Sequence, residues 1–344
     1  MTAPLAAATA TAHANIALVK YWGKRDADLM LPATSSLSLT LSTFDTTTRV
    51  ELAPAGGSGE VTATLDGAPL TGPALAKVQR FVDLVRTRDD VEGDLAGRGA
   101  RVTSVNTVPT GAGLASSASG FAALAGATAA AYGLDLAPRD LSRLARRGSG
   151  SASRSVHGGF VVWHAGDLAD PVRGDLTSFA EPVPAAADLD VAMAVVVLDA
   201  GPKSIGSREA MARTVATSPY FPAWVEHTEV DVAQARDAIA AGDLAQLGEI
   251  AEASAMRMHA TMLAARPAVR YLAPASLGVL DAVAGLRASG TGAWATMDAG
   301  PNVKVLCARV DLDAVVAALE VGGDGGRRRV LRALPGPGLA VTRG

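Results

Sequence analysis

The chain has 344 residues, of which 49% are hydrophobic and 19% are charged. This composition predicts a globular protein and excludes a disordered chain, and the length predicts two lobes because single cores stop growing near ~250–300 residues. A formal net charge of −3 offers no basic surface for nucleic acid, so we expect a small-molecule partner. A single cysteine, Cys307, excludes a disulfide framework and a cysteine-based zinc site, which predicts a cytoplasmic protein.

No membrane segment is expected. The first 14 residues lack the basic start and the long apolar core of a secretory signal peptide. The longest apolar runs, such as 191–198, are far too short to span a bilayer.

Alternating apolar residues predict strands in the first third of the chain. The run Ile-Ala-Leu-Val at 16–19 is typical of a buried strand, and Lys20 follows it directly. Active-site side chains of α/β folds often lie at such a strand end, although a solvated surface lysine is the alternative. Further elements are expected at 37–41, 46–52, 60–65 and 101–106 as strands, and at 73–88 as a helix.

A glycine-rich turn at 109–113 runs directly into a helix that we expect to continue to Tyr132. The free N–H groups of a helix start form an anion site, and Ser116 and Ser117 add hydroxyls that suit phosphate oxygens or Mg²⁺. This is not a Walker A loop, because no Gly-Lys-Ser/Thr follows the glycines. The alternative is a serine that merely caps the helix. The mostly apolar surface of this helix predicts a central position.

A second turn of small residues, 148–155, joins a helix expected at 138–147 to a strand expected at 159–164. Its serine hydroxyls, its N–H groups and the planar guanidinium of Arg154 suit a diphosphate or a carboxylate. A plain Gly/Ser linker is the alternative. The Asp, Pro and Ala-rich stretch 166–189 predicts a loop at the boundary between lobes.

Asp298 begins a tight turn between two strands in the second half of the chain, 292–306. An Asp that only hydrogen-bonds its own turn is the alternative to a functional carboxylate. His259 has no second histidine at metal-ligand spacing, so we expect no metal site there. The other expected elements are a strand at 190–199, helices at 207–216, 229–241, 244–263, 274–289 and 311–320, and a solvated arginine loop at 327–329.

Four stretches together resemble one family. NIALVKYWGKRD, PTGAGLASS, GSGSASRS and MDAGPN occur in the order and at the spacing typical of the diphosphomevalonate decarboxylases of the GHMP kinase superfamily. The resemblance implies an α+β, GHMP kinase-like fold, with an ATP-binding lobe at 1–187, a C-terminal lobe at 188–344 and the active site in the cleft between them. It also implies a homodimer.

The family reaction is the ATP-dependent decarboxylation of 5-diphosphomevalonate to isopentenyl diphosphate. ATP phosphorylates the tertiary 3-hydroxyl, and this phosphate then leaves together with CO₂. The resemblance places Asp298 where the family has the aspartate that orients or deprotonates the hydroxyl. It places Lys20 at the lysine that contacts this aspartate and the transferring phosphate, and Arg154 at the arginine that holds the substrate carboxylate.

The resemblance also implies the ligand-binding positions. The expected ligands are ATP, Mg²⁺ and an acidic phosphorylated substrate. Substrate contacts are implied for Asn15, Tyr21, Lys24, Ser149, Gly150, Ser151, Lys203, Ser207 and Arg208. Nucleotide contacts are implied for Pro109, Gly111, Ala112, Gly113, Leu114, Ala115, Ser116 and Ser117, and Ser117 is also expected near Mg²⁺.

Two other functions stay open at this point. The first is a relative that decarboxylates 5-phosphomevalonate or stops after 3-phosphorylation, and the second is a nucleotide-binding regulatory protein with an inactive site. The chain contains Lys20, Arg154 and Asp298 together, which favours decarboxylation.

Overall fold

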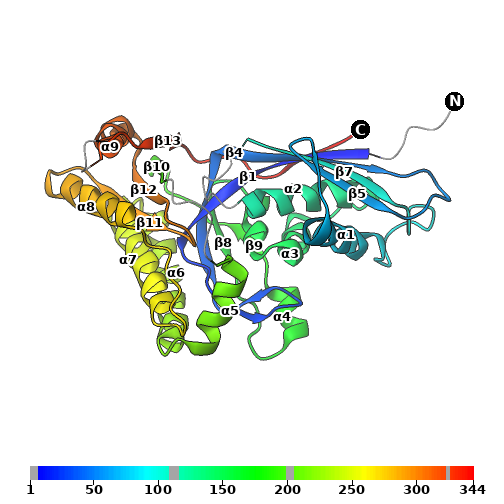
Figure 1. Cartoon of the computed structure of the whole chain (residues 1–344), viewed down its shortest axis with the longest axis horizontal. Helices are drawn as coiled ribbons and strands as arrows, with labels where there is room; N and C mark the ends of the chain where they lie inside the picture. The colour runs from blue at the N-terminus through cyan, green and yellow to red at the C-terminus, as the bar shows by residue number, and fades with distance from the viewer. Residues whose placement is uncertain (1–6, 108–115, 199–204, 323–325) are drawn as a thin grey trace.

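The computed structural model describes residues 7–107, 116–198, 205–322 and 326–344. The α+β fold predicted from the sequence is confirmed, and it contains an eight-stranded sheet, a four-stranded sheet and a two-stranded ribbon (Figure 1). None of the helices in these ranges is both long and apolar enough to cross a membrane.

The larger sheet is built around two long antiparallel strands, β1 (Ala7–Val19) and β4 (Ser36–Leu52). Its order is β14-β1-β4-β7-β5-β6, while β8 also pairs with β4 and β9 pairs with β8. The remaining strands are β5 (Val61–Leu65), β6 (Ala68–Pro69), β7 (Ala100–Asn106), β8 (Phe160–Trp163), β9 (Ala180–Pro182) and β14 (Ala340–Arg343). The separate ribbon consists of β2 (Lys24–Asp26) and β3 (Leu31–Pro32).

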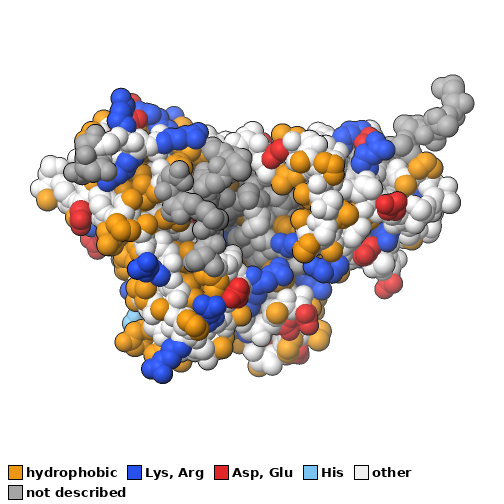
Figure 2. All heavy atoms as spheres, in the orientation of Figure 1, with side chains coloured by type: hydrophobic (Ala, Val, Ile, Leu, Met, Phe, Trp, Pro, Cys, Tyr) orange, Lys and Arg blue, Asp and Glu red, His pale blue; other side chains and the backbone are white. Residues whose placement is uncertain are grey.

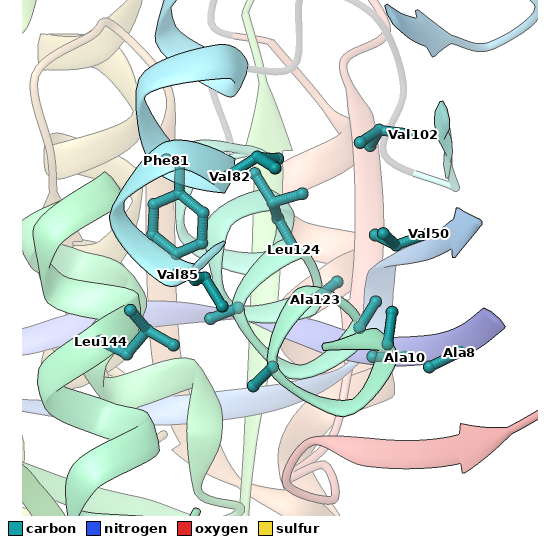
Figure 3. Close-up of a cluster of buried hydrophobic side chains, with 14 of the residues drawn as sticks. Ala8, Ala10, Val50, Phe81, Val82, Val85, Val102, Ala123, Leu124 and Leu144 are labelled. Carbon is teal, nitrogen blue, oxygen red and sulfur yellow. The ribbon is translucent and has the colours of Figure 1, made fainter. Parts of the chain in front are cut away.

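Three helices pack against this sheet and form the first core with it: α1 (Gly72–Arg86), α2 (Ser116–Ala131) and α3 (Pro138–Gly148). Figure 3 shows Phe81, Val82 and Val85 of α1 beside Leu124 of α2, with Val50 of the sheet near them. Helix α2 lies at the centre, because its alanines and Leu124 are buried against β1 and β4. This position is the one expected from its apolar surface.

The smaller sheet has the order β11-β12-β10-β13 and is covered on both faces. One face packs against α8 (Pro274–Ala288) and α9 (Leu312–Glu320). The other face shares a core with α6 (Phe221–Ala241), α7 (Leu244–Leu263) and the ends of β1 and β4. Its strands are β10 (Val191–Val197), β11 (Ala293–Met297), β12 (Val303–Ala308) and β13 (Arg329–Ala333).

The long strands β1 and β4 therefore run through both cores. Ala8 and Ala10 of β1 lie in the first core, whereas Ile16 and Leu18 lie in the core shared with α6 and α7. This course carries the end of β1 to the smaller sheet, where the candidate site lies (Figure 1).

Several predicted boundaries are wrong. The strands expected at 37–41 and 46–52 form one strand, β4, because both pair with β1 across a register shift. The expected loop at 166–189 contains β9 and helix α4 (Pro171–Thr177), since the Asp170 carboxylate caps the first turn of that helix. Helix α6 begins at Phe221 and not at Glu229.

The end of the chain also differs from the prediction. Arg327 and Arg329 are exposed as expected, but Arg329 begins β13, which pairs with β10. Strand β14 then pairs antiparallel with β1, so the last segment of the chain returns to the larger sheet. Short strands of this kind carry too few residues for the alternation of apolar side chains to mark them.

Candidate active site

Three charged side chains meet beyond the end of β1. The ammonium of Lys20 donates a hydrogen bond to Asp298 Oδ1 at 2.7 Å and another to the Ala17 carbonyl at 2.7 Å. The ammonium of Lys304 forms an ion pair with Asp298 Oδ2 at 2.9 Å. Both lysines are only 1% exposed, whereas the Asp298 side chain is 28% exposed. The carboxylate is thus held by two buried cations and still reaches the surface.

The local structure fixes each member of this network. Lys20 directly follows β1, and its backbone N–H donates to the Ser254 hydroxyl of α7 at 3.1 Å. Asp298 follows β11 in a turn closed by the N–H of Gly300, which donates to the Asp298 carbonyl at 2.8 Å. The Asn302 side chain accepts from the Leu198 N–H at 2.6 Å and anchors the other end of the turn. The Asp298 carboxylate therefore pairs with lysines and does not merely cap its own turn.

Burial and charge set the protonation of this network. Burial would raise the pKa of Asp298, but the charges of Lys20 and Lys304 and their hydrogen bonds outweigh it and hold this pKa far below its usual range. Burial lowers the pKa of Lys20 to about 8, although the charge of Asp298 acts in the opposite direction. Asp298 is therefore an anion throughout the neutral range, while Lys20 loses its proton at moderately alkaline pH.

Arg154 lies in a second buried group close to the first. It belongs to the 3₁₀ turn η1 (Gly150–Val156) and is 2% exposed. Its Nε donates to Asn15 Oδ1 at 3.1 Å, and one terminal nitrogen donates to the Ser36 hydroxyl at 2.6 Å. Within the described ranges no carboxylate forms an ion pair with it, and burial lowers its pKa to about 10. A buried guanidinium with neutral partners is suited to receive an anion.

Asn15 connects this group to the turn of small residues. Its amide nitrogen donates to the Ser151 carbonyl at 3.0 Å and to the Ser155 hydroxyl at 2.8 Å. Ser155 in turn donates to the His13 carbonyl at 2.7 Å. The structure thus brings together Asn15, Ser151 and Arg154, three of the positions implied by the resemblance, and β1 supplies both Asn15 and the approach to Lys20.

Tyr21 faces the same turn. Its ring meets the Trp163 ring edge-on at 4.8 Å, and its hydroxyl is buried without a hydrogen-bond partner among the described residues. Burial raises its pKa well above the ordinary value, so the phenol stays protonated. A Cβ added to Gly150 would come within 2.8 Å of the Tyr21 hydroxyl, so glycine is needed for this close approach. The Tyr21 O–H is available to hydrogen-bond a ligand.

A group of cations lies between α1 and α5 (Ser207–Thr217). Burial, and then the charge of Arg208, lowers the pKa of Lys24 to about 8. Burial, followed by the charges of Arg208, Lys24 and Arg80, lowers the pKa of Lys77 to about 8. Figure 2 shows Lys and Arg side chains gathered in this part of the face. Such a group suits an anion with several charges, and Ser207 and Arg208 are exposed beside it.

The predicted nucleotide site lies only partly within the described residues. Ser117 is exposed in the first turn of the 16-residue helix α2, and the Ser149 hydroxyl donates to its hydroxyl at 3.3 Å. Ser116 begins the helix as expected. The other predicted positions, Pro109, Gly111, Ala112, Gly113, Leu114, Ala115 and the substrate position Lys203, lie outside the described residues.

Two residues at the site were missed from the sequence. Lys304 sits in an apolar strand between Val303 and Val305, and a lysine at such a buried position needs a counter-charge, which is the signal that would have identified it. Lys77 lies on α1 with its ammonium 4.2 Å from the centre of the Phe121 ring. Its approach to Lys24 and Arg208 depends on packing between distant segments, so the sequence carries no local signal for it.

Two family models match most of the chain. A family model described as the diphosphomevalonate decarboxylase-like N-terminal domain matches residues 12–179. A second, described as the mevalonate 5-diphosphate decarboxylase C-terminal domain, matches residues 193–322. The chain is 37% identical to the diphosphomevalonate decarboxylase of Aspergillus fumigatus over 328 residues, covering 91% of this chain and 80% of the relative. The human diphosphomevalonate decarboxylase is 34% identical over 327 residues, covering 92% and 80%.

Solved structures show the same likeness over nearly the whole chain. The mevalonate diphosphate decarboxylase of Enterococcus faecalis superposes with a TM-score of 0.88 at 43% identity, covering 99% of this chain and 100% of the other. That of Staphylococcus aureus gives a TM-score of 0.89 at 37% identity, with 98% of each chain covered. Another similar structure, with a TM-score of 0.89 at 44% identity and 99% and 100% coverage, is a complex with MVAPP, AMPPCP and magnesium.

Proposed function

This chain belongs to the diphosphomevalonate decarboxylase family, and we propose that it catalyses the ATP-dependent decarboxylation of 5-diphosphomevalonate to isopentenyl diphosphate. The observation that carries the proposal is the contact of Lys20 with Asp298, with Arg154 close enough for its charge to act on both, from three distant segments of the chain. A nucleotide-binding protein without catalysis has no need for a partly buried carboxylate that is ion-paired with two buried lysines.

Each of the three residues has a task in the proposed reaction. Asp298 accepts a hydrogen bond from the substrate's tertiary 3-hydroxyl and orients its oxygen toward the γ-phosphate. As the new O–P bond forms and the bond from the γ-phosphorus to ADP breaks, the hydroxyl proton passes to an oxygen of the transferred phosphate. Because two lysines keep Asp298 ionised, its main contribution is orientation and charge. The ammonium of Lys20 has three N–H donors, two of which bind Ala17 and Asp298, and the third faces the negative charge of the transferring phosphoryl group.

Arg154 binds the substrate carboxylate until it leaves as CO₂. The C–O bond to the new 3-phosphate breaks, and the electron pair of the bond to the carboxylate carbon forms the double bond. The substrate's diphosphate is expected near Tyr21, Lys24, Ser149 and Arg208. The Tyr21 hydroxyl, which is buried without a partner among the described residues, supports this placement.

The start of α2 fits ATP and Mg²⁺. The exposed Ser117 hydroxyl and the N–H groups of the first turn suit phosphate oxygens, and this hydroxyl would also hold Mg²⁺. Among the described residues, no group of three or more His, Cys, Asp or Glu side chains could hold a metal ion. When bound, Mg²⁺ neutralises charge on the phosphates.

The first test separates the possible reactions. Purified protein is incubated with ATP, Mg²⁺ and either 5-phosphomevalonate or 5-diphosphomevalonate, and ADP and CO₂ are measured separately. We expect both products, in equal amounts, from 5-diphosphomevalonate. CO₂ release from 5-phosphomevalonate alone would identify that compound as the substrate. ADP without CO₂ would show that the protein is a 3-kinase. If neither substrate gives ADP or CO₂, the proposal that the protein is this enzyme is wrong.

The organisation of the enzyme is also part of the proposal. We infer a lobe at 1–187 and a lobe at 188–344, supported by the two separate sheets, with β14 pairing across this division. The active site is expected in the cleft between them. A homodimer is expected from the family resemblance, and a cytoplasmic location is expected from the single cysteine, which is buried. Light scattering on the purified protein would measure the mass of the assembly.

A further inference from the structure

Lys304 occupies an unusual position for a lysine. It lies in the middle of the smaller sheet, where its register partners are Thr296 of β11 and Val195 of β10. Val303 and Val305 point to the core formed with α8 and α9, so Lys304 points to the opposite face, toward the end of β1. A buried ammonium is costly without compensation, and its ion-pair partner within the described ranges is Asp298.

The second oxygen of Asp298 is therefore fixed as firmly as the first. Lys20, which follows β1 of the larger sheet, holds Oδ1 at 2.7 Å, and Lys304 in β12 of the smaller sheet holds Oδ2 at 2.9 Å. Two contacts to the two oxygens determine the plane of the carboxylate, whereas one contact would leave it free to rotate. The two buried cations also outnumber the one anion, which leaves net positive charge where a phosphorylated substrate is expected.

We propose that Lys304 is a positioning residue for the reaction: it sets the orientation of the Asp298 carboxylate and adds to the positive charge beside Lys20. The inference rests on the proposed function, because it assumes that Asp298 and Lys20 act on the substrate. Lys304 acts through these two residues.

The charged groups around Lys20 predict a signature that a purely structural role would not produce. Besides Asp298 and Lys304, these groups are Arg154 from η1 and the buried His259 from α7. Burial and the charge of Lys20 lower the pKa of His259 to about 4, so this imidazole is neutral in the assay range. The charge of Lys304 contributes to lowering the pKa of Lys20, so its removal raises that pKa.

The direction of the pH effect follows. If turnover requires protonated Lys20, the activity of the native enzyme falls as the pH rises through about 8. In Lys304→Met, we expect this alkaline limb to move upward by about one pH unit, because the substitution removes one of the like charges that lower the pKa of Lys20. We also expect kcat to fall about 10- to 100-fold while KM for 5-diphosphomevalonate changes less than about threefold.

A second variant separates orientation from charge. Lys304→Gln keeps an N–H donor for Asp298 but removes the charge. Its kcat should therefore exceed that of Lys304→Met, whereas the alkaline limb of its pH profile should shift by the same amount as in Lys304→Met. Arg287→Met is the matched control, because Arg287 forms a two-bond ion pair with Glu252 and also donates to the Ala293 carbonyl of β11. Its alkaline limb should stay at the native position.

The experiment measures pH profiles of CO₂ release, together with circular dichroism to compare folding. The proposal is supported if the native enzyme turns over 5-diphosphomevalonate, the alkaline limb moves upward in both Lys304 variants, and kcat decreases from the native enzyme to Lys304→Gln to Lys304→Met. The proposal is overturned if Lys304→Met has a kcat within twofold of the native value and the alkaline limb of its pH profile stays at the native position. Unfolding of both Lys304 variants under conditions where Arg287→Met folds would assign Lys304 to stability and also overturn it. Absence of turnover in the native enzyme would instead contradict the proposed function.

Discussion

Asp298 is the residue on which the chemistry depends. Replacing it with Asn removes the charge but keeps the shape, and we expect kcat to fall about 10²- to 10³-fold, the range for the loss of one preorganised group that orients and stabilises the reacting atoms. Nucleotide affinity should be retained, because Asp298 lies on the β11–β12 turn and Ser117 lies at the start of α2. Steady-state CO₂ release and titration with a fluorescent ATP analogue measure the two effects.

A surface carboxylate provides the control for this substitution. Asp313 forms an exposed ion pair with Arg332 on α9 and β13, and Asp313→Asn should keep native kcat and nucleotide affinity. Near-native turnover in Asp298→Asn would show that the role assigned to Asp298 is wrong. Lost nucleotide affinity in Asp298→Asn would place the carboxylate in the ATP site.

At the scale of elements, η1 is the segment most sensitive to small changes. Gly150→Ala would place a methyl group 2.8 Å from both the Tyr21 hydroxyl and the Trp163 ring. Overpacking of this kind costs about 1–3 kcal/mol, so we expect that loss in the free energy of unfolding. Because Tyr21 must move, KM for the phosphorylated substrate should rise about fivefold or more. Urea unfolding and substrate titration measure these two quantities.

Gly285→Ala is the matched control for η1. Gly285 lies inside α8, and a Cβ there would meet no atom within 4 Å. Alanine in a helix interior is favoured over glycine by about 1 kcal/mol, so this variant should be slightly more stable, with an unchanged KM. An unchanged KM in Gly150→Ala as well would argue against a substrate site at this turn.

At the scale of the whole molecule, β1 and β4 join the two main cores. Leu39 and Val50 both belong to β4, but Leu39 lies in the core with α6 and α7, and Val50 lies in the core with α1 and α2. We therefore expect one cooperative unfolding transition, in which tryptophan fluorescence and circular dichroism coincide. Leu39→Ala should lower the free energy of unfolding by about 2–5 kcal/mol, and the protein should still unfold in a single transition. Two separate transitions, with only one shifted by Leu39→Ala, would show that the cores unfold independently.

The sequence predicted α7, α1 and β7 well, because the apolar patterns of these elements are local. Helix α7 has the bounds expected from its apolar periodicity, and β7 and α1 differ from prediction by one or two residues at an end. Strands β9 and β14 were not predicted, since each is short and exists through pairing with another strand, β8 and β1 respectively. Helix α4 was also missed, although Asp170 and Pro171 at its start are local signals.

Some residues of the candidate site could be identified from the sequence, and others only from the structure. Lys20, Arg154 and Asp298 were identified from motifs, because reactive residue types stood beside glycine-rich turns and strand ends in a recognisable order. Only the tertiary structure decided that Lys304 grips the second oxygen of Asp298 and that Lys77 approaches Lys24 and Arg208. Motifs record which side chains are present at a turn, whereas the pairing of buried charges depends on how the two sheets meet, and no local pattern encodes that meeting.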